Sequence, residues 1–158
     1  MLEDIKKCCC FTGHREIPQS DLNALRDDLD FEIEKHYILH GVTTFISGGA
    51  VGFDMLAAET VIGAKQRHPD IKLVFVLPCD GHNKSWKASD SAKLRVLMLH
   101  ADQTLCLADH YYRGCMHQRN KFMLEHSAYC ISYCRKDSGG TFYTLSLARK
   151  TNKTVTEL

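Results

Sequence analysis

Short apolar runs alternate with longer amphipathic stretches along the chain, and this alternation restricts the fold more than any other feature. Runs of this kind indicate repeated strand-to-helix units, which build a mainly parallel sheet. We therefore expect an α/β fold, a three-layer sandwich whose sheet has about six strands. The expected strands are residues 8–12, 43–47, 72–77, 103–107, 129–133 and 154–157.

The amphipathic stretches between these strands predict helices. Leu22, Leu25, Leu29 and Ile33 recur at helical spacing, and Ser20 is the candidate N-cap of that helix. The other expected helices are residues 53–67, about 115–126 and about 140–150. Residues 78–91 are polar and make a long connection, so they are the candidate lid of a ligand site.

Length and charge exclude several classes of protein. A chain of 158 residues has the size of one domain, and we expect that domain to span residues 1–158. Its 20 basic and 19 acidic residues give a formal net charge of +1, without the basic excess of a general nucleic-acid binder. Because neither a membrane span nor a signal peptide is evident, we expect a cytoplasmic protein with no membrane partner.

Eight cysteines are the compositional exception. They form no Cys-x-x-Cys pair and no ligand set with zinc spacing, so we expect no metal site. We expect reduced thiols, most of them acting as small buried apolar residues. Those expected in the core are Cys8, Cys9, Cys10, Cys106, Cys130 and Cys134, whereas Cys79 and Cys115 are expected near the ligand site.

The turn after the first expected strand carries groups that bind anions. Thr12, Gly13, His14 and Arg15 follow one another there. The guanidinium of Arg15 can hold a phosphate or a carboxylate through two hydrogen bonds. The alternative is a surface turn with an incidental arginine.

A glycine-rich turn follows the second expected strand. Gly48, Gly49 and Gly52 lack a β carbon, so main-chain N–H groups there can approach an anion at the start of the next helix. Asp54 falls in the first turn of that helix, where it either compensates the helix dipole or binds a ribose hydroxyl. The turn predicts an anion site and leaves both roles of Asp54 open.

A third turn follows the fifth expected strand and contains Ser138, Gly139, Gly140 and Thr141. These residues offer N–H and O–H donors, or they form a plain glycine turn. The carboxyl ends of parallel strands meet at one edge of a sheet. We therefore expect the glycine turns to share one crevice that binds a ligand with phosphate and sugar groups.

Further candidate ligand contacts lie outside these turns. Arg119 shares a largely apolar helix face and needs either a structural ion pair or a ligand there. Tyr112 and Asn120 belong to the same stretch. Trp86, in the polar segment, either stacks on a base or anchors that segment to the core.

These motifs in combination resemble those of the YpsA-like branch of the SLOG superfamily, which also includes Smf/DprA and the LOG phosphoribohydrolases. The resemblance extends over nearly the whole chain and implies a Rossmann-like sheet that binds nucleotides or their derivatives. It also implies a possible homodimer. The motifs are Cys-Phe-Thr-Gly-His-Arg at 10–15, Gly-Gly-Ala-Val-Gly-Phe-Asp at 48–54 with Glu59, Tyr112 with Gly114, Arg119-Asn120 with Met123, and Ser-Gly-Gly-Thr at 138–141.

The LOG enzymes allow a narrower comparison. They resemble this chain at Met-His-x-Arg-Lys, where Arg119 takes the position of the arginine. Their later Pro-Gly-Gly-x-Gly-Thr-x-x-Glu loop is shorter here, and residues 142–146 hold no carboxylate. A hydrolase of this type would therefore depend on Asp54 or Glu59 as the acidic group.

The favoured function is binding or sensing of a nucleotide derivative, such as a nucleoside phosphate, NAD or an ADP-ribose-like molecule, with no required cofactor. One alternative is an N-glycosidic hydrolase with Arg119 on the phosphate and Asp54 or Glu59 at the ribose. A second alternative, suggested by kinship with Smf/DprA alone, is a single-stranded DNA-binding module. The near-neutral charge opposes it, so nucleic acid is not the expected partner.

Overall fold

A computed structural model describes Leu2 and residues 4–158, and its centre is a six-stranded sheet in which all neighbouring strands are parallel. The spatial order is β4-β3-β2-β1-β5-β6. This confirms the expected α/β class and the mainly parallel sheet. The strands are β1 (Cys8–Gly13), β2 (Thr44–Ser47), β3 (Lys72–Leu77), β4 (Gln103–Cys106), β5 (Tyr129–Tyr133) and β6 (Thr154–Glu157).

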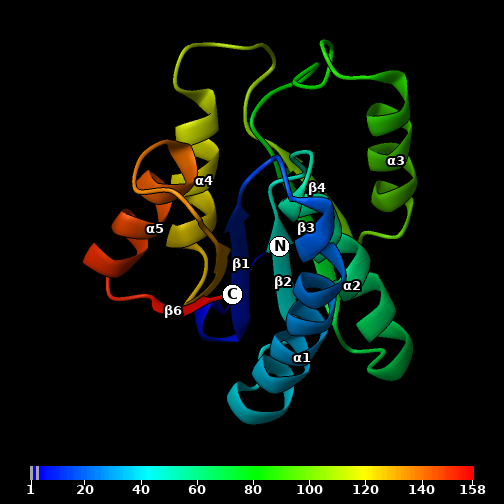
Figure 1. Cartoon of the computed structure of the whole chain (residues 1–158), viewed down its shortest axis with the longest axis vertical. Helices are drawn as coiled ribbons and strands as arrows, with labels where there is room; N and C mark the ends of the chain where they lie inside the picture. The colour runs from blue at the N-terminus through cyan, green and yellow to red at the C-terminus, as the bar shows by residue number, and fades with distance from the viewer. Residues whose placement is uncertain (1, 3) are drawn as a thin grey trace.

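Helices cover both faces of this sheet, as Figure 1 shows. Three of them lie on one side and two on the other, which gives the three layers. The first group is α1 (Leu22–His40), α2 (Phe53–Arg67) and α3 (Ala88–Leu99); the second is α4 (Cys115–Glu125) and α5 (Gly140–Lys150). Short 3-10 turns, η1 (Ile5–Lys7) and η2 (Gln19–Asp21), precede β1 and α1.

Strand β1 shows why both faces of the sheet are apolar. Cys9 and Phe11 pack in the cluster under α1, α2 and α3, whereas Cys8 and Cys10 pack in the cluster under α4 and α5. Successive side chains of a strand point to opposite faces, so a central strand buried on both sides needs a continuous apolar run. The run from Cys8 to Phe11 meets this requirement.

Helix α1 follows the expected stripe but begins differently. Leu25, Leu29 and Ile33 are buried, and the helix ends at Gly41, whose φ of 68° is the left-handed C-cap conformation. Ser20 is not its N-cap. The chain first makes the turn η2, the N-cap position falls on Asp21, and no side chain there accepts a capping hydrogen bond.

Helix α3 is the element that the sequence pattern did not predict. It takes up the last four residues of the expected loop 78–91. Leu94 and Leu97 are its buried residues, while Val96 and Leu99 are exposed, so its apolar periodicity is weak. The strand ends differ by one residue: β1 extends to Gly13, β2 begins at Thr44 and β4 ends at Cys106.

The eight cysteines are all free thiols. Six are buried, namely Cys8, Cys9, Cys10, Cys79, Cys115 and Cys130. The expectation of core packing is wrong for Cys106, which is exposed, and only partly met by Cys134, which is half-buried. Both lie at the carboxyl ends of strands, where the chain leaves the sheet and the side chain loses its second layer of cover.

The strand order has a direct consequence for ligand binding. From β1 the chain builds β2, β3 and β4 on one side of the sheet, then crosses to build β5 and β6 on the other. The carboxyl ends of β1 and β5 therefore border the switch point, which is where open α/β sheets bind ligands. Within the described chain, none of the helices is long and apolar enough to cross a membrane.

Candidate functional site

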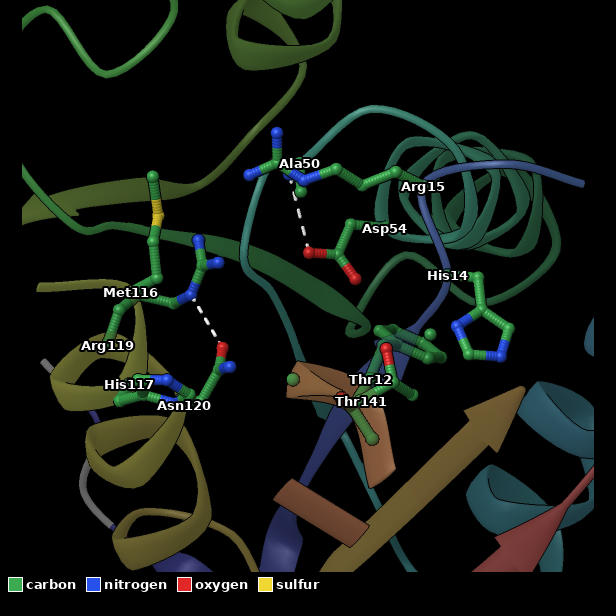
Figure 2. A pocket seen from close by; sticks show the side chains of 13 residues that line it. Thr12, His14, Arg15, Ala50, Asp54, Met116, His117, Arg119, Asn120 and Thr141 are labelled. Atoms are coloured by element: carbon green, nitrogen blue, oxygen red, sulfur yellow. Dashed lines mark hydrogen bonds between the residues drawn. The ribbon is translucent and has the colours of Figure 1, made fainter. Parts of the chain in front are cut away.

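A cavity of about 350 Å³ lies at this switch point, within the usual range of ligand sites of roughly 300–1,000 Å³. Four segments line what we call the site cavity: residues 11–15 at the end of β1 and just beyond it, Ala50 and Asp54 around the start of α2, part of α4, and the start of α5. Figure 2 shows the Asp54 carboxylate and the Arg119 guanidinium directed toward the same space from α2 and α4.

Asp54 is a buried carboxylate in the wall of the site cavity, with 7% of its surface exposed. The Ala50 N–H donates to its Oδ2 at 3.3 Å, and the Ser47 hydroxyl donates to its main-chain carbonyl at 2.9 Å. Burial raises the pKa of the Asp54 carboxyl, while the charges of Arg119 and Arg15 act in the opposite direction. The carboxyl therefore holds its proton to a higher pH than an exposed aspartate.

Arg119 is buried on the opposite wall, with 5% of its surface exposed. Its Nε donates to Asn120 Oδ1 at 2.8 Å, and one terminal nitrogen donates to the Gly48 carbonyl. Burial lowers the pKa of this guanidinium, and Asp54 partly counters the effect. No carboxylate among the described residues comes within 4.0 Å of Arg119, so its charge is left without a direct ion pair.

The turn after β1 places two basic groups at the rim. Arg15 is exposed, and its side chain carries a second guanidinium to the site cavity. His14 accepts the Arg135 N–H at Nε2 over 2.7 Å, which leaves the proton of the neutral ring on Nδ1. Burial, together with Lys136 and Arg135, lowers the pKa of His14.

The glycine turn after β2 uses part of its set of main-chain donors within the chain. The Gly49 N–H donates to Ser47 Oγ, the Ala50 N–H to Asp54, and the Phe53 N–H to the His14 carbonyl. Three of the turn's donors are therefore already used within the chain.

Gly48 and Gly52 lie where other parts of the chain pack closely. A β carbon on Gly48 would stand 2.7 Å from the Asp54 carboxylate and 2.8 Å from the Arg119 guanidinium. At Gly52, where φ is 89°, it would overlap the Arg15 carbonyl. The absence of these side chains is what lets the two charged walls approach each other.

A chain of hydrogen bonds connects Arg119 to the start of α5. Asn120, which accepts from Arg119, donates through Nδ2 to Thr144 Oγ1 at 3.1 Å. Thr144 Oγ1 in turn donates to the Gly140 carbonyl at 2.9 Å. Helices α4 and α5 are thereby held in one arrangement, and Gly140 and Thr141 stay at the edge of the site cavity.

The structure brings most of the sequence candidates together. Those that line the site cavity are Thr12, Gly13, His14, Arg15, Asp54, Arg119, Asn120, Gly140 and Thr141. Gly48, Gly49 and Gly52 lie behind its wall, and Ser138 and Gly139 line a neighbouring hollow. The remaining three, Glu59, Trp86 and Tyr112, lie outside the site cavity.

Each of these three outlying residues has a local explanation. Glu59 forms an ion pair with Lys93 of α3 at 2.5 Å. Trp86 packs against the core, with its ring 5.2 Å from that of His82, so the segment before α3 is anchored and contributes no side chain to the cavity lining. Tyr112 is exposed in the connection that leads to α4.

Sequence reasoning missed Phe11, Ala50, Met116 and His117, which also line the site cavity. Met116 and His117 stand in the first turn of α4, directly before the predicted Arg119. The signal that could have identified them is their place in the first turn of a helix that begins near the switch point. Among the described residues, no group of three or more His, Cys, Asp or Glu side chains is placed to hold a metal ion.

Chemically, this arrangement can hold an anion and a hydroxyl-bearing group side by side. Arg119 and Arg15 offer charged N–H donors, and Asp54 offers an acceptor in the same cavity. Thr12 and Thr141 add neutral hydroxyl groups at the floor. These groups are complementary to a phosphate with a sugar beside it.

Solved structures with a similar fold include two DNA processing proteins. DNA processing protein A of Helicobacter pylori, described with its single-stranded DNA binding mode, superposes with a TM-score of 0.66 at 17% identity and covers 97% of this chain. DprA of Streptococcus pneumoniae gives 0.66 at 14% identity over 99%. This chain spans 65% and 50% of those two chains, and the likeness shows the fold.

Curated relatives are similar in sequence. A UPF0398 protein of Staphylococcus epidermidis is 33% identical over 136 residues, which cover 79% of this chain and 71% of that protein. The SPbeta prophage-derived protein YoqJ of Bacillus subtilis is 27% identical over 139 residues, 80% of this chain and 81% of that protein. The model of the YspA SLOG family matches residues 11–157. The chain therefore belongs to the YspA SLOG family, as its motifs had indicated.

Proposed function

We propose that this protein binds a nucleotide or nucleotide derivative, a nucleoside phosphate, NAD or an ADP-ribose-like molecule, in the site cavity, in a binding or sensing role. The phosphate lies between Arg119 and Arg15, and a ribose hydroxyl hydrogen-bonds to Asp54. The observation that carries this proposal is the buried Arg119 without a direct ion pair, opposite a buried carboxylate. A buried cation costs free energy unless an anion compensates it, and a bound phosphate supplies that anion.

The test is titration of the purified protein with a panel of nucleoside monophosphates, NAD and ADP-ribose. Binding to the folded state at a ligand concentration of 100 times Kd stabilises it by about 2.7 kcal/mol, which a thermal melt resolves readily. Calorimetry then gives the Kd. A melting temperature that no member of the panel moves at millimolar concentration would overturn the proposal.

Single-stranded DNA is the second candidate ligand. The similarity in fold to DNA processing protein A of Helicobacter pylori, which binds it, favours this candidate, and makes the expectation of no nucleic-acid partner doubtful. Arg15, Arg135 and Lys136 line a hollow next to the site cavity, where they would contact a strand. The net charge of +1 still opposes it.

Salt dependence distinguishes the two candidates. A labelled oligonucleotide that binds through several phosphates loses affinity steeply as salt rises, because each contact releases counterions. Fluorescence anisotropy at low and at physiological salt measures this slope. No binding at low salt would reject the DNA candidate and leave the small-molecule proposal unaffected.

A further inference from the structure

A second, shallower hollow adjoins the site cavity on the side of α5. It has a volume of about 720 Å³ and is lined by His117, Phe142, Tyr143, the turn 137–139 and Ser146. We call it the aromatic hollow. His117 lines both spaces, so the two are adjacent.

The rings of the aromatic hollow are available for contact. Tyr143 has 56% of its surface exposed and Phe142 has 37%, although both stand in the first turn of α5. The His117 ring meets Tyr143 edge to face, with centroids 5.2 Å apart at 72°. That contact orients the Tyr143 ring. Flat aromatic bases stack on exposed rings of this kind.

The hollow on the other side of the site cavity offers no comparable surface. Its ring is that of Tyr133, which is buried, and the Arg135 guanidinium already covers it at 4.5 Å from the centroid. Charged residues of both signs, including Glu16 and Asp21, make up much of the remaining lining. The flat face of an aromatic base is therefore better matched by the aromatic hollow.

The position of the aromatic hollow relative to the charges is fixed by hydrogen bonds already described. The first turn of α5 contributes Thr141 to the site cavity and Tyr143 to the aromatic hollow. Thr144, one residue further on, accepts from Asn120 of α4, the neighbour of Arg119. The Tyr143 N–H donates to the Gly139 carbonyl at 2.9 Å and holds the turn itself. A ligand that spans both spaces therefore meets a preformed surface.

We propose that the aromatic hollow is the base subsite of the nucleotide whose phosphate and ribose occupy the site cavity. The base stacks on Tyr143, against Phe142 and the edge of His117. This inference rests on the proposed function, because the phosphate must first be held at Arg119. The occupant is the base of the same small molecule, because His117 borders both spaces and the first turn of α5 contributes to both.

The experiment compares ribose 5-phosphate, which lacks a base, with the four common nucleoside monophosphates. Wild-type protein is expected to bind the best nucleotide at least about fivefold more tightly than ribose 5-phosphate, since one stacked base contributes a factor of roughly 5 to 150. Tyr143→Ala is expected to remove most of that difference and to leave the affinity for ribose 5-phosphate unchanged. Tyr143→Phe, which keeps a ring, is expected to retain it.

Phe31→Ala is the matched control, because Phe31 is a 65% exposed aromatic residue on α1, away from both spaces. It should change neither affinity. Tyr143→Leu repeats the test with a bulky side chain that has no ring, in case the alanine variant is unstable.

The possible failures are distinguishable. Equal affinity for ribose 5-phosphate and nucleotides, or an equal loss of both in Tyr143→Ala, overturns the base subsite and leaves the phosphate site standing. A wild-type protein that binds none of these ligands, and neither NAD nor ADP-ribose, overturns the proposed function together with the subsite. Binding of a single-stranded oligonucleotide that Tyr143→Ala abolishes and Arg119→Met preserves would assign the rings to nucleic acid and also overturn the proposal.

Discussion

Replacing Arg119 with methionine separates ligand binding from folding. Methionine has a similar length and no charge, so it fills most of the same space within the wall of the site cavity. The guanidinium has five N–H donors. Two of these are used, by Asn120 and by the Gly48 carbonyl, which leaves three for a ligand. A phosphate that accepts two of these three loses both in the variant.

The structure allows the loss to be estimated. Hydrogen bonds to a charged group contribute about 1.5–3 kcal/mol each, so two contribute about 3–6 kcal/mol. At about 1.4 kcal/mol per tenfold, the Kd for a nucleotide should rise by roughly 10²–10⁴. Arg119→Lys keeps a charge but not the fork of donors, so its Kd should lie between those of wild type and Arg119→Met.

The fold should tolerate this change. Two internal hydrogen bonds of the charged guanidinium are lost, at about 1.5–3 kcal/mol each, while removal of a buried cation offsets much of the loss. A net loss of about 1–3 kcal/mol lowers the melting temperature by about 2–12 °C for a chain of this size and leaves the protein folded. Calorimetric titration with the best ligand of the panel, alongside a thermal melt, measures both quantities.

Arg149 supplies the control for a general effect of losing an arginine. It is about half exposed near the end of α5 and pairs with Glu157 at 2.7 Å. Arg149→Met should bind nucleotides as wild type does. The reasoning is refuted if Arg119→Met is folded and its nucleotide Kd matches that of wild type.

Three other predictions concern single groups. Because the pKa of Asp54 is raised in the fold, its contribution to stability is present below its unfolded pKa and is lost as pH rises through the folded pKa. Asp54→Asn should thus be more stable than wild type at pH 7 in urea titrations, with the difference shrinking at pH 4, and should bind nucleotides more weakly; equal curves at both pH values would contradict this. The pKa of His14 is lowered from its ordinary 6.5, so its contribution to stability should fall as pH drops through 6.5, in wild type but not in His14→Gln; parallel curves for the two proteins would count against it. Finally, nucleotides incubated with the protein should remain intact by chromatography, because Asp54 is the one carboxylate that the described residues place in the site cavity; release of free base that Asp54→Asn abolishes would make the protein a hydrolase instead.

The sheet was predictable because a strand that is buried on both faces needs a continuous apolar run, which is easily recognised in the sequence. The run from Cys8 to Phe11 reads as a strand whichever layer covers it. Helix α3 was not predictable, since it buries Leu94 and Leu97 and leaves Val96 in solvent. A pattern search depends on one apolar face, and this helix has a narrow one.

The site was predictable where function follows from position along a strand. Thr12 to Arg15 lie at and just beyond the end of β1, and Asp54 follows β2 after one turn; the parallel order brings these two strand ends together. The position of the glycine turn was predictable, but its surroundings were not, because a sequence does not tell whether the space beside Gly48 holds a ligand or other side chains. Here Asp54 and Arg119 fill it.

The reactivity of the cysteine thiols in this chain can report on opening of the folded structure. Six thiols are buried, three of them in succession on strand β1, whereas Cys106 is exposed and Cys134 is partly exposed. A thiol-reactive dye should therefore label the native protein quickly at Cys106, more slowly at Cys134, and at the other positions at a rate set by unfolding. Ligands of the site cavity would slow that last phase, so binding can be followed without any engineered probe.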